Sequence, residues 1–461
     1  MFPYFLATVN LPPSPDVNPI GLGFTILMGF LFLVIPRRFV LVPVTILVSF
    51  MTMGEAFQIA GAHFTMIRIL VLFGWLRVIL RGESRRLQWN AIDKVFVAWM
   101  VVRGTAYVLL WQSFEAINYQ LGYAYNAFGF YFLFRFLMKD LDNVFAAFRP
   151  IALFAIPLAA SMAFEKSTGR NIFAIFGGVM PTTIIRDGVL RCQGPFAHPI
   201  LAGTYGAVIL PLCIALWWRG NKALALMGTV SALVITLTSA SSGPLLSAVA
   251  GIVGLCMWRW RGRLRIVRWG MVLGLIGLHM VMKAPVWFLL ARVDIFSGST
   301  GYHRAFLIDR AVANFSDWWL VGTKSTEAWA DADQHLFDVT NQYIWEGVEG
   351  GFLTLLLFIF IIGFSFQAVG RAVLAVKDKS MSVGFPIWAL GASLLVHVVS
   401  YISVPYFDQM IVVWYLGLAM ISSAREATLE NATESTSGGL VRLRRQYGII
   451  LAWRTDHRLS A

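Results

Sequence analysis

The chain has 461 residues, of which 58% are hydrophobic and only 13% are charged, and its mean hydropathy is +0.70. Soluble domains carry roughly a quarter charged residues, so this composition excludes a soluble globular protein and indicates one that crosses a membrane many times. The net charge of +13 is spread over many segments, which favours membrane topology and contact with anionic lipids over nucleic-acid binding. Cys192, Cys213 and Cys256 have neither CxxC spacing nor an obvious pairing, so we expect no metal cluster and no disulfide framework.

Apolar runs of roughly 20 residues, the length that a helix needs to cross a bilayer, recur along the whole chain. The fold class that they predict is all-α: a polytopic integral membrane protein with about 11 to 13 transmembrane helices and one long periplasmic loop. We place the spans at 18–35, 39–56, 64–80, 92–112, 118–138, 145–164, 198–218, 223–239, 243–258, 267–284, 342–366, 383–403 and 406–423. No Lys or Arg precedes the first run, so this segment is expected to stay in the membrane rather than to be a removable signal peptide.

Five regions follow from this placement of the spans. They are an N-terminal transmembrane bundle (1–190), core transmembrane helices (191–284), a large periplasmic loop (285–341), C-terminal transmembrane helices (342–423) and a cytoplasmic tail (424–461). Two parts of the placement have alternatives: the closely spaced pair of spans around Pro405, and the N-terminal region, where Pro13, Pro15 and Pro19 could equally precede a surface helix.

Basic residues cluster in alternate loops, and loops of this kind face the cytoplasm. The N-terminus and the loops 165–197 and 285–341 then face outward, and the C-terminus is cytoplasmic. The residues that set this orientation are Arg37, Arg38, Arg81, Arg85, Arg86, Lys139, Arg219, Lys222, Arg259, Arg261, Arg263, Arg265, Arg268, Arg371, Lys377, Lys379 and the tail from Arg425.

The two long outward loops depart from this charge rule, whereas the short outward loops contain no Lys or Arg. The cations of the long loops are Lys166, Arg170, Arg186, Arg191, Arg292, His303, Arg304, Arg310 and Lys324. Their confinement to two loops on one face is typical of a site for a lipid-linked phosphate. The alternative is that long loops escape the topological rule and carry ordinary solvated charge.

The stretch 186–206 leads from a cationic segment into an apolar run. Pro199 suits the first position of a helix, because its φ is fixed and it has no N–H. The unpaired N–H groups of that helix, beside Arg186 and Arg191, form a place for an anion. His198 directly precedes the proline, and the alternative for this residue is that it only caps the helix.

The second long loop contains Gly-Tyr-His-Arg at 301–304, Val-Gly at 321–322, and Asn341-x-Tyr-Ile with Glu349-x-Gly at its return to the membrane. Together with Arg-x-x-Gly-x-Phe-x-His-Pro at 191–199, these motifs make the chain resemble the superfamily of O-antigen ligases and O-antigen polymerases of the bacterial envelope. The resemblance covers roughly residues 185–360. The first five or six spans resemble the family only in being apolar.

The resemblance implies a membrane glycosyltransferase of surface or exopolysaccharide biosynthesis. Such enzymes move a glycan from an undecaprenyl-diphosphate carrier to an acceptor sugar or glycolipid at the outer face of the bacterial inner membrane, without a metal, nucleotide or other cofactor. Arg191 and Arg304 match the two family arginines thought to hold the diphosphate. Fixed guanidinium groups can stabilise the charge that develops on this leaving group.

The chain departs from the family at Thr340, where ligases usually carry a His directly before the Asn. A threonine cannot act as the base there, so proton removal is expected to fall to His335, Asp338 or Glu349, with Asn341 orienting the base. We favour Asp338, because a partly desolvated carboxylate has a raised pKa. The loss of His weakens a strict ligase assignment and shifts weight towards a polymerase.

Other polar and aromatic residues have simpler interpretations. Arg68 and Arg103 fall inside predicted spans, where charges face the bundle interior, and we expect them to be helix-packing partners. Trp318, Trp319 and Trp329 stack on sugar rings or dip into the lipid surface, and the sequence does not separate these two roles.

The competing function is a transporter or flippase of polysaccharide or lipid. Transporters often carry broken helices around a site at the bilayer midplane, whereas here the unusual polar residues lie in outward loops. The enzyme is therefore the favoured interpretation.

Overall fold

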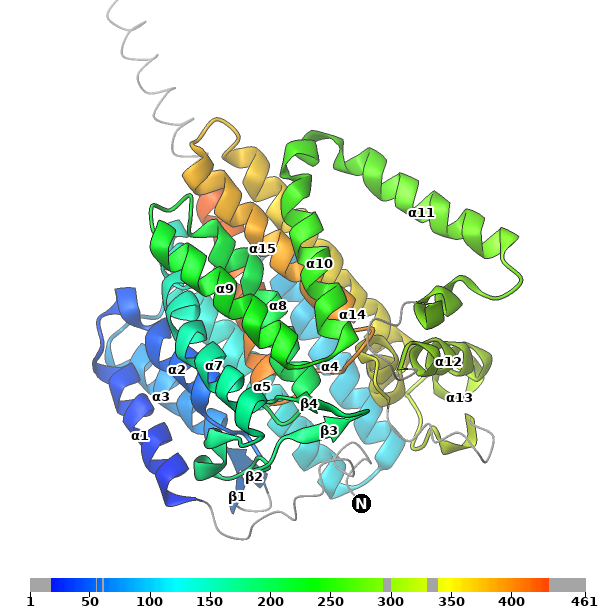
Figure 1. Ribbon diagram of the computed structural model, residues 1–461, viewed down its shortest axis with the longest axis horizontal. Coiled ribbons are helices and arrows are strands. Elements are labelled where there is room, and N and C mark those ends of the chain that lie inside the picture. The colour runs from blue at the N-terminus through cyan, green and yellow to red at the C-terminus, as the bar shows by residue number, and fades with distance from the viewer. Residues whose placement is uncertain (1–17, 55, 60–61, 293–299, 330–338, 431–461) are drawn as a thin grey trace, which may run out of the picture.

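The computed structural model describes residues 18–54, 56–59, 62–292, 300–329 and 339–430. The described chain is a bundle of helices with two short antiparallel hairpins at one end (Figure 1). Its helices up to residue 168 are α1 (Pro19–Val34), α2 (Leu41–Phe50), α3 (Met66–Leu80), α4 (Ala91–Trp111), α5 (Phe114–Leu137), α6 (Leu141–Ala146) and α7 (Phe148–Thr168). The hairpins are β1 (Ala56–Ile59) with β2 (Ala62–Thr65), and β3 (Ile184–Arg186) with β4 (Val189–Arg191).

The second part of the chain supplies the remaining helices. These are α8 (Pro199–Ala215), α9 (Lys222–Thr238), α10 (Ser242–Cys256), α11 (Leu264–Val281), α12 (Thr300–Ala313), α13 (Phe315–Trp318), α14 (Gln342–Ala375), α15 (Met381–Ser400) and a C-terminal helix (Gln409–Glu430). Short 3₁₀ helices join them at Arg37–Phe39, Ile172–Phe176, Met257–Arg263, Val286–Arg292 and Glu327–Trp329.

Each predicted span contains a helix, so the all-α prediction is confirmed. The predicted number of spans is not confirmed. Six helices of the described chain are long and apolar enough to cross a membrane, and Pro19–Val34, Pro199–Ala215 and Lys222–Thr238 are apolar but shorter. The predicted span 39–56 contains only the ten residues of α2, about 15 Å of helix. This is half the thickness of a bilayer core.

The C-terminal helix is the most buried of the six, with 83% of its apolar window inside the bundle. Its described part extends to Glu430, beyond the predicted residue 423, so it takes in the start of the predicted tail. The reason is that Glu426 is buried and forms an ion pair with Arg135 at 2.8 Å, which holds the last turns of the helix inside the protein.

α11 has the opposite character and stands apart from the bundle in Figure 1. None of its residues is buried, although its side chains are mostly apolar. The helix therefore exposes most of its apolar surface, including Ile266, Met271, Leu273, Met280 and Val281, rather than packing it against the bundle.

Candidate functional site

Residues 192–198, which lead into α8, are held in place by Glu165 at the end of α7. The carboxylate of Glu165 is 1% exposed and accepts hydrogen bonds from the backbone N–H groups of Gln193 (3.1 Å) and Gly194 (2.9 Å). Gly194 has φ = +55°, a conformation that a residue with a side chain rarely adopts. The glycine of the first motif therefore allows the turn that presents two N–H groups to one buried carboxylate.

Two amide side chains complete the support of this segment. Asn171 donates a hydrogen bond to the backbone oxygen of Gly194 (2.7 Å). Gln409, at the start of the C-terminal helix, donates to the backbone oxygens of Pro195 (3.0 Å) and Met51 (2.9 Å). The motif is thus fixed by two residues of the preceding stretch, Glu165 and Asn171, and by the distant Gln409, and none of these three carries a sequence signal that pointed to it.

Arg191 ends β4, after a tight turn in which Asp187 (φ = +52°) and Gly188 (φ = +74°) both have left-handed backbone conformations. Its Nη2 donates a hydrogen bond to the hydroxyl of Ser241 at 2.7 Å, and its Nε is buried with no hydrogen-bond partner in the described part of the chain. Burial, with a smaller contribution from the charge of Arg186, lowers the pKa of Arg191. An arginine keeps its charge in proteins, so this guanidinium is a buried cation that an anion would stabilise.

Arg304, on α12, reaches the same place from the second long loop. It is only 8% exposed. A Cβ placed on Gly243 would lie 3.4 Å from Nη2 of Arg304 and 2.6 Å from the hydroxyl oxygen of Ser403. Gly243 therefore provides room for Ser403, and the Arg304 guanidinium lies beside it at the first turn of α10.

Both motif arginines consequently lie near the N-terminus of α10. Arg191 donates to Ser241, which directly precedes the helix, and Arg304 lies beside Gly243, its second residue. The side chain of Ser241 donates to the backbone oxygen of Ser239 and does not cap the helix. Both guanidinium groups thus lie near the first turn of a 15-residue helix, and a helix N-terminus and arginine side chains are both groups that bind anions.

Arg186 and His198 have more peripheral positions. The side chain of Arg186 is 48% exposed and pairs weakly with the adjacent Asp187 at 3.7 Å. The Nδ1 of His198 accepts a hydrogen bond from the backbone N–H of Ile200 (3.1 Å). His198 therefore has the helix-capping role that the sequence left as the alternative, and Arg186 contributes charge near Arg191 without a described contact to Ser241.

Only some of the residues predicted to take part in proton transfer lie within the described part of the chain. Asp338 and His335 lie outside the described residues. Asn341 caps α14, because its side-chain oxygen accepts from the N–H groups of Tyr343 (2.9 Å) and Ile344 (3.2 Å). The hydroxyl of Thr340 is buried and has no hydrogen-bond partner among the described residues. The position directly before Asn341 is therefore held by a buried hydroxyl group.

Asp408 is a carboxylate near this region that the motifs did not indicate. It has φ = +51° and directly precedes Gln409, which bonds to Pro195 of the first motif. Burial raises the pKa of Asp408 to about 6. The residue fell inside a predicted span, so the signal that singled out Arg68 and Arg103, a charge within an apolar run, also marked this position.

Arg103 forms a buried ionic cluster with the first turns of α14. Its Nη1 and Nη2 lie 3.1 Å from Glu346 and 3.0 Å from Glu349, and all three side chains are at most 6% exposed. Glu346 also accepts hydrogen bonds from Trp99 (3.0 Å) and Gln342 (2.7 Å). Arg103 is thus a helix-packing partner, as expected, and Glu349 is bound to it rather than placed as an independent base.

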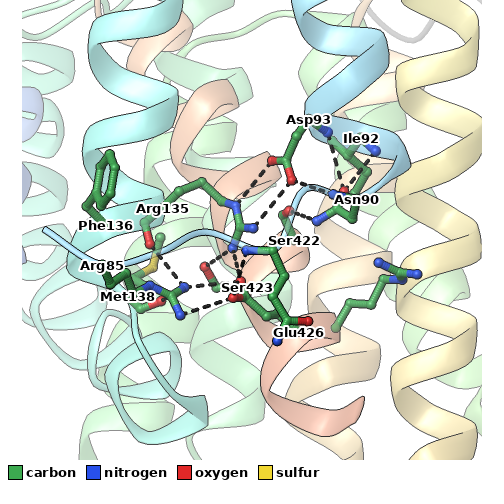
Figure 2. Close-up of polar contacts among 12 residues, drawn as sticks. Arg85, Asn90, Ile92, Asp93, Arg135, Phe136, Met138, Ser422, Ser423 and Glu426 are labelled. Carbon is green, nitrogen blue, oxygen red and sulfur yellow. Dashed lines mark hydrogen bonds and ion pairs between the residues drawn. The ribbon is translucent and has the colours of Figure 1, made fainter. Parts of the chain in front are cut away.

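A second ionic cluster lies around Arg135 on α5 and is shown in Figure 2. Arg135 is fully buried and binds Asp93 of α4 (3.2 Å) and Glu426 of the C-terminal helix (2.8 Å). Glu426 also pairs with Arg85 at 3.1 Å, and Asn90 donates to the hydroxyl of Ser422. These groups are mutually paired, so the cluster has a structural role: it joins α4, α5 and the C-terminal helix.

Neither a search for metal-binding groups nor a comparison with known proteins assigns a function to the site. In the part of the chain that the structure describes, no group of three or more His, Cys, Asp or Glu is placed to hold a metal ion. No family model matches the chain, and no curated protein matches it either. The resemblance to the O-antigen ligases and polymerases therefore rests on the motif residues themselves.

Proposed function

We propose that the protein is a membrane glycosyltransferase of the O-antigen ligase and polymerase type. It moves a glycan from an undecaprenyl-diphosphate carrier to an acceptor sugar at the periplasmic face of a bacterial inner membrane, for surface or exopolysaccharide biosynthesis. The observation that carries the proposal is the position of Arg191 and Arg304, from two different loops, beside residues 241–243 at the N-terminus of α10. A diphosphate is the anion that two guanidinium groups and a helix N-terminus suit together.

In the proposed reaction an acceptor hydroxyl attacks the anomeric carbon of the donor glycan. The bond between that carbon and the diphosphate oxygen breaks, and its electron pair leaves with the diphosphate. Arg191 and Arg304 stabilise the negative charge that develops there. The hydroxyl proton goes to a general base, for which we propose Asp338. The C-terminus is cytoplasmic in this arrangement, and the site faces outward.

The function is tested in a strain that lacks the gene. Loss of a transferase leaves lipid-linked precursor on the outer face with no polymer or ligated glycan. Loss of a flippase leaves the precursor on the inner face, and that result would replace the proposal with the transporter alternative.

Transfer is expected to need no divalent metal. The two arginines supply the positive charge that Mg²⁺ or Mn²⁺ supplies in other diphosphate sites. Purified enzyme should therefore keep its rate in excess chelator. Activity that is lost in the chelator and restored by one added metal would contradict this expectation.

The identity of the base is tested by rate against pH for single variants. Asp338→Asn should lower transfer by about 100-fold or more and remove the fall in rate at low pH, because the carboxylate must be ionised to accept a proton. His335→Gln and Thr340→His serve as neighbouring variants in the same segment.

Asp408→Asn is the comparison that the structure provides for this test. A base with the pKa of Asp408, about 6, is protonated and inactive below that pH, so a rate that depended on it would fall as pH decreases through 6. If Asp338 is the base, the Asp408→Asn variant should still show the fall in transfer rate at low pH. If that fall is lost in Asp408→Asn and kept in Asp338→Asn, the base is Asp408.

A further inference from the structure

The segment 312–320, which follows Arg304 on α12 and continues through α13, exposes a group of apolar side chains. Their exposed fractions are 54% for Val312, 40% for Phe315, 50% for Trp319 and 64% for Leu320. The neighbouring Trp318 is buried, and its indole N–H donates to the backbone oxygen of Ala311 at 2.8 Å. The exposed group is therefore a surface feature of an ordered segment.

Backbone contacts fix this segment against α14. The N–H of Phe352 donates to the oxygen of Trp319 (2.8 Å), and the N–H of Thr323 donates to the oxygen of Val348 (2.9 Å). α14 is interrupted at Gly351, where φ is +78°. A Cβ on Gly351 would lie only 2.3 Å from the backbone oxygen of Leu320, so the glycine is required for this close approach.

The position of Gly351 along α14 sets the depth of the exposed group. Arg371 lies on the same helix, 371 − 351 = 20 residues further on, which corresponds to about 30 Å of helix. This equals the thickness of the hydrocarbon core of a bilayer. With Arg371 at the inner surface, Gly351 and the backbone of Trp319 and Leu320 lie at the outer boundary of the hydrocarbon.

The exposed group also continues an apolar surface that α14 presents to lipid. The exposed side chains of α14 include Phe352, Leu353, Ile359, Phe360 and Phe366. The ring of Phe352 contacts that of Phe315, with centroids 5.3 Å apart. One apolar strip thus runs from the middle of α14 onto the segment 312–320.

We propose that Phe315, Trp319 and Leu320 insert into the outer leaflet of the bilayer and hold α12, with Arg304, at the depth of the lipid headgroups. The inference rests on the membrane arrangement of the proposed function. Tryptophan is enriched at this depth in membrane proteins, and insertion removes from water the apolar surface of all three side chains. The sequence left sugar stacking and lipid contact open for three tryptophans. Trp318 and Trp329 are buried, so neither role suits them, and the proposal assigns lipid contact to Trp319.

Spin labels measure this depth directly. A single cysteine replaces Leu320 in the full chain carrying Cys256→Ser, where the other native thiols, those of Cys192 and Cys213, are buried. The protein is reconstituted in vesicles of phosphatidylethanolamine and phosphatidylglycerol. Collision rates of the label with oxygen, which partitions into lipid, and with a water-soluble nickel chelate are compared. Ser316→Cys is the matched control, an exposed polar position of α13, and Gly363→Cys marks the middle of α14.

The label at position 320 is expected to meet oxygen more often than nickel, and the label at 316 to show the reverse. A label at 320 that meets mainly nickel, while the label at 363 meets mainly oxygen, overturns the insertion but leaves the membrane arrangement intact. Nickel access at position 363 as well would overturn both. Spectral broadening between labels at position 320 of two molecules would show that a second copy covers this face, and would also overturn the proposal.

Discussion

Arg191→Ala and Arg304→Ala are each expected to lower glycan transfer by about 100-fold to 1,000-fold, the loss seen when one fixed donor to a developing negative charge is removed. Each guanidinium lies at the N-terminus of α10, where Arg191 donates to Ser241 and Arg304 lies beside Gly243. Membrane insertion should be unchanged, because neither residue lies inside a predicted span. The measurement is the rate of product formation by purified enzyme, normalised to the amount of folded protein.

Two further variants make this result specific. Arg→Lys at either position should restore little activity, because an ammonium group does not reproduce the planar, two-pronged geometry of guanidinium. Arg170→Ala is the matched control, since Arg170 is an exposed arginine in the same outward loop. Near wild-type product from Arg191→Ala or Arg304→Ala would remove that residue from the diphosphate site.

Arg103→Ala is expected to destabilise the protein by about 3–5 kcal/mol, the cost of breaking a buried ion pair by removing one partner. The substitution leaves Glu346 and Glu349 buried without their counter-charge. It also removes the contact of the guanidinium with the ring of Tyr123 (4.3 Å to the centroid). The measurement is the thermal unfolding temperature of the purified protein in detergent.

A combined variant tests whether unpaired charge is the cause. Arg103→Met with Glu346→Gln and Glu349→Gln removes all three charges together and should recover most of the lost stability, because apolar or neutral replacements of a whole buried ionic group are often tolerated. Arg68→Ala is the control, as Arg68 is only half-buried and bonds to Asn126. Equal destabilisation by Arg68→Ala and Arg103→Ala would mean that burial of the pair does not matter.

Helices were the part of the fold that the sequence predicted well, because a run of apolar residues with a matching length is a local signal. The errors arose where tertiary contacts decide the outcome. α2 ends at Phe50, and the chain then continues in an extended conformation at Met51, whose backbone oxygen bonds to the distant Gln409. The C-terminal helix extends to Glu430 because Glu426 finds a buried arginine on another helix.

The candidate site was likewise predicted only in part. The motifs singled out Arg191 and Arg304, but they did not indicate that both lie beside the start of α10. Residues 241–243 are two serines and a glycine at the start of a span, and such small residues have no pattern of their own. Glu165 was missed because its role depends on the backbone N–H groups of Gln193 and Gly194, which sequence composition does not reveal.

The central position of the C-terminal helix has a consequence for biosynthesis. Ribosomes make a chain from its N-terminus, so this helix is the last of the bundle to emerge, although it is the one most enclosed by the others. Until it arrives, Arg135 lacks Glu426, Asn90 lacks Ser422, and Pro195 lacks Gln409. The buried polar groups of the earlier helices are therefore fully satisfied only once this last helix has packed among them.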